Sequence, residues 1–364
     1  MANFSRRSFL QASLLAASCL AARSAISQER RKVSFTLPFL AEGNNAYVFV
    51  ALAKGYWDEL GLDVQVSRGA GSVASAQAIA TGKFQFGLAV PTAAIQQAAK
   101  GLPIVSIASA GYDATMGICV LDNSPIRTAA DIKGKRVGTV VTSGEHPFLP
   151  LFAQRAGFDI KDVQLVQTDP NVRQRLLISG QIDCFSGFAG SFIPPLIAQG
   201  HSAHALLYSQ YGMTLYNNAL LTTPEMLAKE PKLCADITMG LLKGIKHVML
   251  EPEDSLKMFL QKVPEAGLTP AGVEQVRLGI GIFINTMLAD IAYKNPLGYA
   301  APDDYAEMID LHMKYVASPG DKAPKTADLM SDDFLGKLTL TPDEWKKAQA
   351  NAAPFKKYLA PKAA

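Results

Sequence analysis

Residues 79–87, Ile-Ala-Thr-Gly-Lys-Phe-Gln-Phe-Gly, have a close counterpart in residues 177–185, Leu-Ile-Ser-Gly-Gln-Ile-Asp-Cys-Phe. In each copy a helical pattern ends at a glycine, and an apolar run typical of a strand follows at once. After each strand come a turn and a short helix, which ends at Gly101 in the first copy and at Gly200 in the second. The repeat therefore predicts two similar lobes, each with a sheet and covering helices.

The rest of the chain also favours an α/β fold. Short apolar runs alternate with helical patterns from residue 32 to about residue 209, which is typical of mainly parallel sheets covered by helices. We predict a first lobe of residues 33–121 and 218–350, which includes a group of C-terminal helices, and a second lobe of residues 122–217. Two chain crossings between the lobes would then form a hinge. The predicted strands are 33–39, 62–66, 84–90, 104–108, 117–121, 135–141, 163–167 and 218–222, and the longer predicted helices are 46–60, 73–81, 147–156, 172–179, 235–250, 255–262, 269–286 and 303–316.

Composition excludes a protein that grips a nucleic-acid backbone. The chain has 364 residues, of which 49% are hydrophobic, enough for a large core in about two domains. Three of its 35 basic residues lie in residues 1–27, so the remainder carries 32 basic and 32 acidic residues. Binding to DNA or RNA needs a basic excess, and the body of this chain has none.

The N-terminus has the pattern of an export signal. Ser5-Arg6-Arg7-Ser8-Phe9-Leu10 precedes an apolar run over residues 12–22, which is about half the length of a membrane-spanning helix. The string resembles a twin-arginine signal, and the small residues 25–27 would allow cleavage before Gln28. We therefore predict a periplasmic protein with residues 1–27 removed. An ordinary secretory signal and a lipoprotein anchored at Cys19 are the alternatives.

One glycine motif resembles a dinucleotide-binding site, but the acidic residue that such a site requires is missing. Residues 69–74, Gly-Ala-Gly-Ser-Val-Ala, match the G-x-G-x-x-A of dinucleotide-binding folds. That fold needs an acidic residue at the end of the next strand, and residues 64–112 contain no Asp or Glu. We therefore expect no cofactor, and instead a polar cradle at a helix start that holds part of a small ligand. The scattered histidines also predict no metal site.

Candidate binding residues follow the predicted strands. In open α/β sheets, ligands bind beyond the carboxyl ends of the strands. The loops at those ends carry small polar groups and aromatic rings without a nucleophile–base pair, which suits binding better than catalysis. The expected ligand-binding residues are Glu42, Asn44, Asn45, Tyr47, Gly71, Ser72, Pro91, Thr92, Tyr112, Asp113, Ser143, Gly144, Glu145, His146, Ser186, Phe188, Tyr211 and Tyr216.

Two phrases carry a family resemblance. Residues 49–64, FVALAKGYWDELGLDV, and residues 129–138, AADIKGKRVG, resemble signatures of the substrate-binding proteins of ABC importers. The similarity is to the nitrate, sulfonate, taurine and thiamine-precursor group, and it extends over about residues 33–260. It implies a two-lobed periplasmic-binding-protein fold of type II with two hinge crossings. It also implies a monomer that closes on a solute and delivers it to a membrane permease.

Two other classes remain as alternatives. An enzyme on the same fold would resemble the fungal pyrimidine-precursor synthases, which carry a cysteine-rich motif. Beyond residues 1–27 this chain has only the isolated Cys119, Cys184 and Cys234, so we expect buried, inert thiols and no enzyme. A ligand-sensing module that acts on a receptor is the third class.

The expected ligand is a small organic molecule. Helix starts at Ser72 and Gly144 favour electron-rich groups, whereas Glu42, Asp113 and Glu145 favour N–H donors and repel anions. A thiamine-type pyrimidine satisfies both sets and could stack on aromatic rings, with sulfonates as the second choice. We further expect Glu42 and Glu145 to accept hydrogen bonds from one ligand, each from its own lobe.

Overall fold

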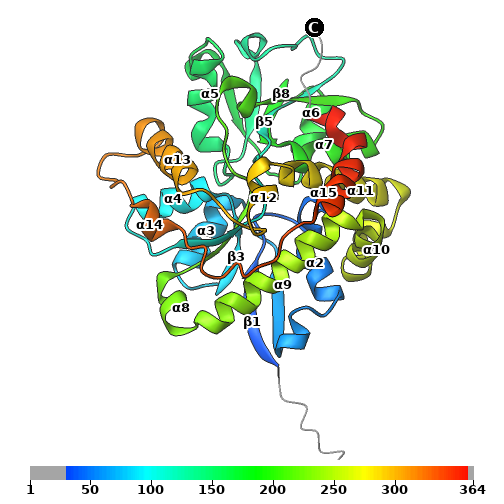
Figure 1. Ribbon diagram of the computed structural model, residues 1–364. Helices are drawn as coiled ribbons and strands as arrows, with labels where there is room; N and C mark the ends of the chain where they lie inside the picture. Colours follow the sequence, from blue (N-terminus) through cyan, green and yellow to red (C-terminus); the bar gives the residue numbers. More distant parts are fainter. Residues whose placement is uncertain (1–29, 360–364) are drawn as a thin grey trace, which may run out of the picture.

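Two five-stranded sheets of the same topology form the core of the molecule. The computed structural model describes residues 30–359, so the predicted export signal and Cys19 lie outside the described residues. The strand orders are β2-β1-β3-β10-β4 and β7-β6-β8-β5-β9. In each sheet three parallel strands are followed by one strand that runs antiparallel to both of its neighbours. This symmetry confirms the two similar α/β lobes, with the first lobe below and the second above in Figure 1.

Every predicted strand is present within a few residues of its expected position, whereas β9 was not predicted. The first sheet contains β1 (Arg31–Thr36), β2 (Leu62–Ser67), β3 (Phe86–Ala89), β4 (Val105–Ser109) and β10 (Ala219–Thr222). The second sheet contains β5 (Met116–Leu121), β6 (Arg136–Thr139), β7 (Gln164–Gln167), β8 (Cys184–Phe188) and β9 (Ala203–Leu207).

Helices cover both sheets, and a C-terminal group joins the lobes. The helices before the return to the first sheet are α2 (Ala46–Ala53), α3 (Ser72–Ala80), α4 (Pro91–Ala99), α5 (Leu149–Arg155), α6 (Arg173–Ile178) and α7 (Ala189–Ala198). Those after it are α8 (Pro224–Lys229), α9 (Pro231–Leu250), α10 (Pro252–Lys262), α11 (Pro270–Met287), α12 (Asp290–Lys294), α13 (Pro302–Tyr315), α14 (Thr326–Leu329) and α15 (Pro342–Ala352). Within residues 30–359, no helix is both long enough and apolar enough to cross a membrane.

The predicted lobe boundary after residue 121 is wrong by one strand. Residues 116–121 were expected in the first lobe, but β5 pairs with β8 and β9 in the second sheet. The chain therefore crosses between the lobes at residues 110–115 and returns between β9 and β10. A short apolar run shows that a strand is buried but does not show which sheet buries it, so the pattern could not place this crossing.

The predicted helix over residues 46–60 is also shorter than expected. It ends at Ala53, because Gly55 takes a left-handed conformation with φ of 70°. The chain then turns so that Trp57 enters the core at 1% exposure and donates its indole N–H to the carbonyl of Ile237. Trp57 is therefore buried, as its spacing from the other apolar residues predicted, but it lies in a turn and not on the helix.

Helix α11 packs on both lobes. It lies against α10 and the 3₁₀ turn η1 (Gly43–Asn45) in the first lobe and against α7 in the second. Its Ile282 belongs to the apolar core of the second lobe, while Ile280 and Phe283 belong to that of the first. A helix that follows the return crossing therefore contributes to the surface between the lobes.

Candidate functional site

A pocket lies between the two lobes, at the carboxyl ends of the strands. The space between its walls, open solvent at the mouth included, is about 700 Å³. Its lining comes from loops of both lobes, from both crossings and from α11. The lining residues are Pro38, Phe39, Asn44, Gly71, Ser72, Ala114, Thr115, Val140, Ser143, Pro170, Arg173, Phe188, Gly190, Ser191, Asn217, Asn218, Ile282, Phe283 and Thr286.

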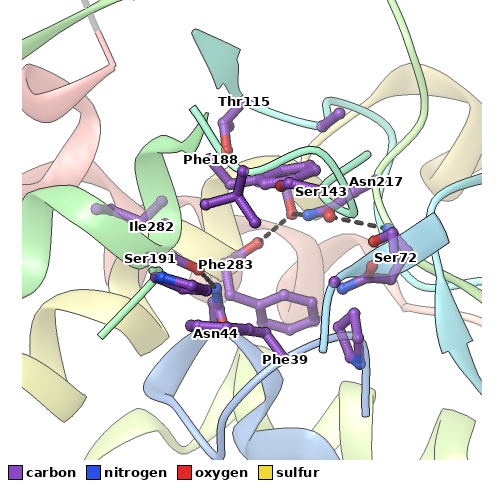
Figure 2. Close-up of a pocket in the computed structure, with 18 of the residues that line it drawn as sticks. Phe39, Asn44, Ser72, Thr115, Ser143, Phe188, Ser191, Asn217, Ile282 and Phe283 are labelled. Atoms are coloured by element: carbon purple, nitrogen blue, oxygen red, sulfur yellow. Dashed lines mark hydrogen bonds between the residues drawn. The ribbon is translucent and has the colours of Figure 1, made fainter. Parts of the chain in front are cut away.

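Aromatic rings line opposite sides of the pocket. Phe188, at the end of β8 in the second lobe, lies across the pocket from Phe39 and Phe283 (Figure 2). The Phe283 ring is supported from behind by Tyr47, whose ring centroid is 4.7 Å away. Such an arrangement can hold a flat, apolar ring between two faces.

Polar side chains surround the space between these rings. Ser72 stands at the start of α3, and Ser143 lies in the loop after β6, so both lobes contribute hydroxyl groups. Asn217, at the return crossing, donates from Nδ2 to Thr286 Oγ1 over 3.3 Å (Figure 2). The lining therefore combines hydrogen-bonding groups with aromatic faces, as expected for a binding site.

Five of the expected residues line the pocket: Asn44, Gly71, Ser72, Ser143 and Phe188. All five lie at or beyond the carboxyl end of a strand, so the positional rule found them. The rule missed Phe39, Arg173, Ser191 and Phe283, which also line the pocket. Phe39 follows the first strand by three residues and could have been found, whereas the other three lie within helical patterns.

Contacts between the lobes close one end of the pocket. Ser191, on α7, donates to Glu42 Oε2 over 2.7 Å and accepts from Asn44 Nδ2 over 3.0 Å. Burial raises the pKa of the Glu42 carboxyl to about 7, although the hydrogen bond from Ser191 and the positive charge of Arg173 oppose the shift. Glu42 thus connects the lobes at the edge of the pocket instead of lining it.

A second set of contacts closes the opposite end. Thr142 in the second lobe donates from Oγ1 to the carbonyl of Ala70 over 2.7 Å and accepts from the backbone N–H of Val73 over 3.1 Å. Gly71 lies between these contacts with φ of 112°, and a Cβ there would be 2.3 Å from the Thr142 carbonyl oxygen. The glycine in the predicted cradle is therefore required both for its conformation and for the close approach of the two lobes.

Glu145 does not reach the pocket, in contrast to the expected direct contact with the ligand. Its side chain is 0% exposed and accepts hydrogen bonds from Ser143 and, over 3.1 Å, from Ser186. The Ser186 hydroxyl also lies 3.2 Å from that of Thr139, which in turn is 2.7 Å from Nδ1 of His146. Burial lowers the pKa of the His146 imidazole. This network supports Ser143 from behind, so Ser143 is the group that faces the ligand space.

The remaining expected residues lie outside the pocket lining and have structural partners. Asn45 accepts from the backbone N–H of Glu42, and Pro91 begins α4. Asp113 accepts from the backbone N–H of Thr115, and burial raises its pKa. The three tyrosines bond elsewhere: Tyr112 to the carbonyl of Tyr299, Tyr211 to the backbone N–H of Ala129 and Tyr216 to Asp304.

Three expected residues are packed without such partners. Tyr47 and Thr92 are buried in the first lobe, and neither hydroxyl has a hydrogen-bond partner in the described part of the chain. Gly144 is buried where the lobes meet, against Ser72 and Val90. The expected set thus marks the correct region, but most of its members support the pocket or the interface between the lobes.

The fold is that of periplasmic binding proteins of type II, because two crossings join two sheets of this topology around a central pocket. The alkanesulfonate-binding protein SsuA from Xanthomonas axonopodis pv. citri, solved with bound MOPS, matches with a TM-score of 0.62 at 16% identity. The match covers 83% of this chain and 99% of that one. At this identity the likeness establishes the fold.

The chain belongs to the NMT1/THI5-like family, whose model matches residues 42–255. It is 25% identical over 273 residues to a Haemophilus influenzae protein named as a thiamine biosynthesis protein, covering 75% of this chain and 81% of the relative. It is also 25% identical over 268 residues to the formylaminopyrimidine-binding protein of Halalkalibacterium halodurans, with 73% and 81% coverage. The family confirms the resemblance to the thiamine-precursor group that the sequence carries.

Proposed function

We propose that this protein is an extracytoplasmic solute-binding protein that delivers a small organic molecule to an ABC importer by closure of its two lobes. The observation that carries the proposal is the pocket between the lobes, which is lined by aromatic rings and single hydrogen-bonding groups. None of its lining residues forms a nucleophile–base pair. The proposal includes a monomer, a permease partner, export by the twin-arginine signal and no enzymatic turnover.

The proposed ligand is a thiamine-type pyrimidine. A flat ring fits between Phe188 and the Phe39–Phe283 side, and ring nitrogens and amino groups can bond to the serine and asparagine side chains. The name of the Halalkalibacterium halodurans relative supports the same class. An alkanesulfonate is the second candidate, because Arg173 and three serines line the pocket and suit an anionic group.

A thermal-shift screen tests this proposal. The panel contains nitrate, alkanesulfonates, taurine and aminopyrimidines. We expect an aminopyrimidine to raise the melting temperature, since a ligand at a hundred times its Kd stabilises the folded state by about 2.7 kcal/mol. A shift with alkanesulfonates alone would favour the second candidate. Chemical conversion of the bound compound by the pure protein would contradict the non-enzymatic proposal.

Binding is expected to strengthen as the pH falls from 7 towards 4.5. In the closed form the pKa of Glu42 is about 7. Opening admits water, which removes the effect of burial and returns the pKa towards 4.5. This outweighs the loss of the hydrogen bond from Ser191, so closure takes up a proton in this window. We expect at least about a tenfold gain in affinity for the wild type, a modest value because Glu42 is only half-buried.

Isothermal titration calorimetry of Glu42→Gln checks this pH dependence. The variant cannot take up the proton, so the pH slope of its affinity should be shallower than that of the wild type. A ligand that itself titrates contributes equally to both proteins. Glu59→Gln, an exposed change far from the pocket, is the matched control. Equal slopes for the wild type and Glu42→Gln would assign the proton uptake to another group.

A further inference from the structure

Arg173 is a buried cation without an anionic partner. It is the first residue of α6, it lines the pocket and it is 5% exposed. It makes no ion pair with any residue in the described range 30–359. Nη1 donates to the carbonyl of Ser186 over 3.3 Å, whereas Nε is buried and has no hydrogen-bond partner. Most of its donor capacity is therefore unused.

The surrounding residues hold the guanidinium in place. Its carbon lies 5.0 Å from the centroid of the Phe185 ring, which supports the planar group by a cation–π contact. Gly187 leaves room for it, because a Cβ at that position would be 2.9 Å from Arg173 Nη1. The position is thus built around this side chain, and the arginine is fixed in its place without a ligand.

This arrangement is costly unless a ligand provides an acceptor. A guanidinium keeps its charge at every physiological pH, so it cannot escape burial by losing a proton. A buried polar N–H without a partner is destabilising, and a charged donor is more so. A ligand oxygen at Arg173 would satisfy the free donors in the pocket. Because Arg173 lines the pocket with most of its donors unused, the ligand is expected to bring an acceptor.

We propose that Arg173 anchors a neutral carbonyl oxygen of the ligand, such as the oxygen of a formamide group on a pyrimidine ring. This inference rests on the proposed function. The oxygen is neutral because the charge of Arg173 already acts on one nearby carboxyl group, although the two form no ion pair. The Arg173 charge acts on Glu42, and Glu145 shares Ser186 with it as a hydrogen-bond partner. A full anion would meet these groups, whereas a carbonyl accepts the N–H bond without added charge.

A pair of ligands that differ only in the carbonyl tests the anchor. The probes are formylaminopyrimidine and its parent aminopyrimidine without the formyl group, measured by isothermal titration calorimetry. Wild type should prefer the formyl compound by about ten- to a hundred-fold, as for one hydrogen bond to a charged group. Arg173→Met should lose this preference while it still binds the ring. Arg173→Lys should keep part of it, because the ammonium retains the charge without the planar fork.

Arg175→Met is the matched control, because Arg175 lies on the same helix with its side chain exposed. It should leave the preference unchanged. A preference that survives in Arg173→Met, or equal binding of both pyrimidines to wild type, overturns the anchor and leaves the proposed function standing. Binding of neither pyrimidine overturns the anchor together with the proposed pyrimidine ligand. Tighter binding of an alkanesulfonate that depends on Arg173 would show that the anchor takes an anion, which overturns the neutral carbonyl.

Discussion

Gly144→Leu is expected to hold the lobes apart and to weaken ligand binding more than a hundred-fold. Gly144 lies in the second lobe, and a Cβ there would be 2.6 Å from Val90 Cγ2 and 3.2 Å from Ser72 Cβ in the first lobe. Its backbone is outside the left-handed region, so a side chain adds no backbone strain. The two closest contacts of the leucine are with the first lobe, whereas Phe188 of its own lobe is 3.4 Å from the Cβ position. A hundred-fold loss of affinity corresponds to about 2.7 kcal/mol, which is the binding energy that the ligand loses when one lobe no longer reaches it.

Two measurements check this prediction. Calorimetry gives the loss of affinity, and solution scattering should show that ligand reduces the radius of gyration of the wild type but not of Gly144→Leu. Gly267→Leu is the control, since Gly267 is exposed, lies outside the pocket lining and would bring its Cβ no closer than 3.5 Å to Leu260. A variant that binds and contracts like the wild type would contradict closure as the mode of binding.

The two-lobed fold could be predicted because its signal is local. The repeated phrases end their helices at Gly82 and Gly180, which have φ of 76° and 69° in the structure. A glycine that ends a helix and is followed by an apolar run can be recognised without knowledge of the tertiary structure. The same reasoning found most strands to within a few residues.

The sheet to which β5 belongs could not be predicted in the same way. Both β5 and β4 are buried almost throughout, and both runs fit either sheet. The antiparallel pairing of β5 with β8 and β9 depends on the path of the chain at residues 110–115. Such a path is a tertiary property, and one sequence does not carry it in a readable pattern.

The pocket was located more reliably than its individual residues. Ser72, Ser143 and Phe188 follow strands, so a rule about strand ends found them. Arg173 and Phe283 lie within helical patterns, where an arginine is usually solvated and a phenylalanine usually belongs to the core. Nothing in their spacing distinguishes a side chain that faces a pocket from one that faces the interior or the solvent.

The different roles of Glu42 and Glu145 could not be predicted from the sequence either. Glu42 and Glu145 occupy equivalent places after strands in the two lobes, and the sequence suggested equal roles. In the structure Glu145 is 0% exposed beneath Ser143, whereas Glu42 meets Ser191 across the interface between the lobes. Their difference depends on neighbouring serines from other elements, which sequence position alone does not reveal.

The protein is expected to lose about 2.5 kcal/mol of stability between pH 7.5 and pH 4.5 through a single histidine. His312, on α13, is 1% exposed, and neither ring nitrogen has a hydrogen-bond partner in the described part of the chain. Burial lowers its pKa from 6.5 to about 4, although the charge of Asp321 opposes the shift. The charge of Lys100 contributes to the lowered pKa.

The direction of this pH dependence follows from proton binding to the folded and unfolded states. Between pH 6.5 and pH 4 the unfolded chain binds a proton at His312 and the folded protein does not, so acid favours unfolding. Each pKa unit of difference is worth about 1.36 kcal/mol, and the loss levels off below pH 4. The stability associated with the neutral imidazole is therefore fully present above pH 6.5 and declines through this window.

Urea unfolding of His312→Leu at pH 7.5 and pH 4.5 isolates this contribution from all other titrating groups. The leucine has no proton to bind and no unsatisfied nitrogen, so the variant should match or exceed the wild type at pH 7.5. Its loss of unfolding free energy in acid should be about 2.5 kcal/mol smaller than that of the wild type. His201→Gln, at the half-buried turn before β9, controls for removal of an imidazole elsewhere. Equal acid losses in His312→Leu and wild type would mean that His312 gains a proton in the folded state, through water that reaches the space beneath α13.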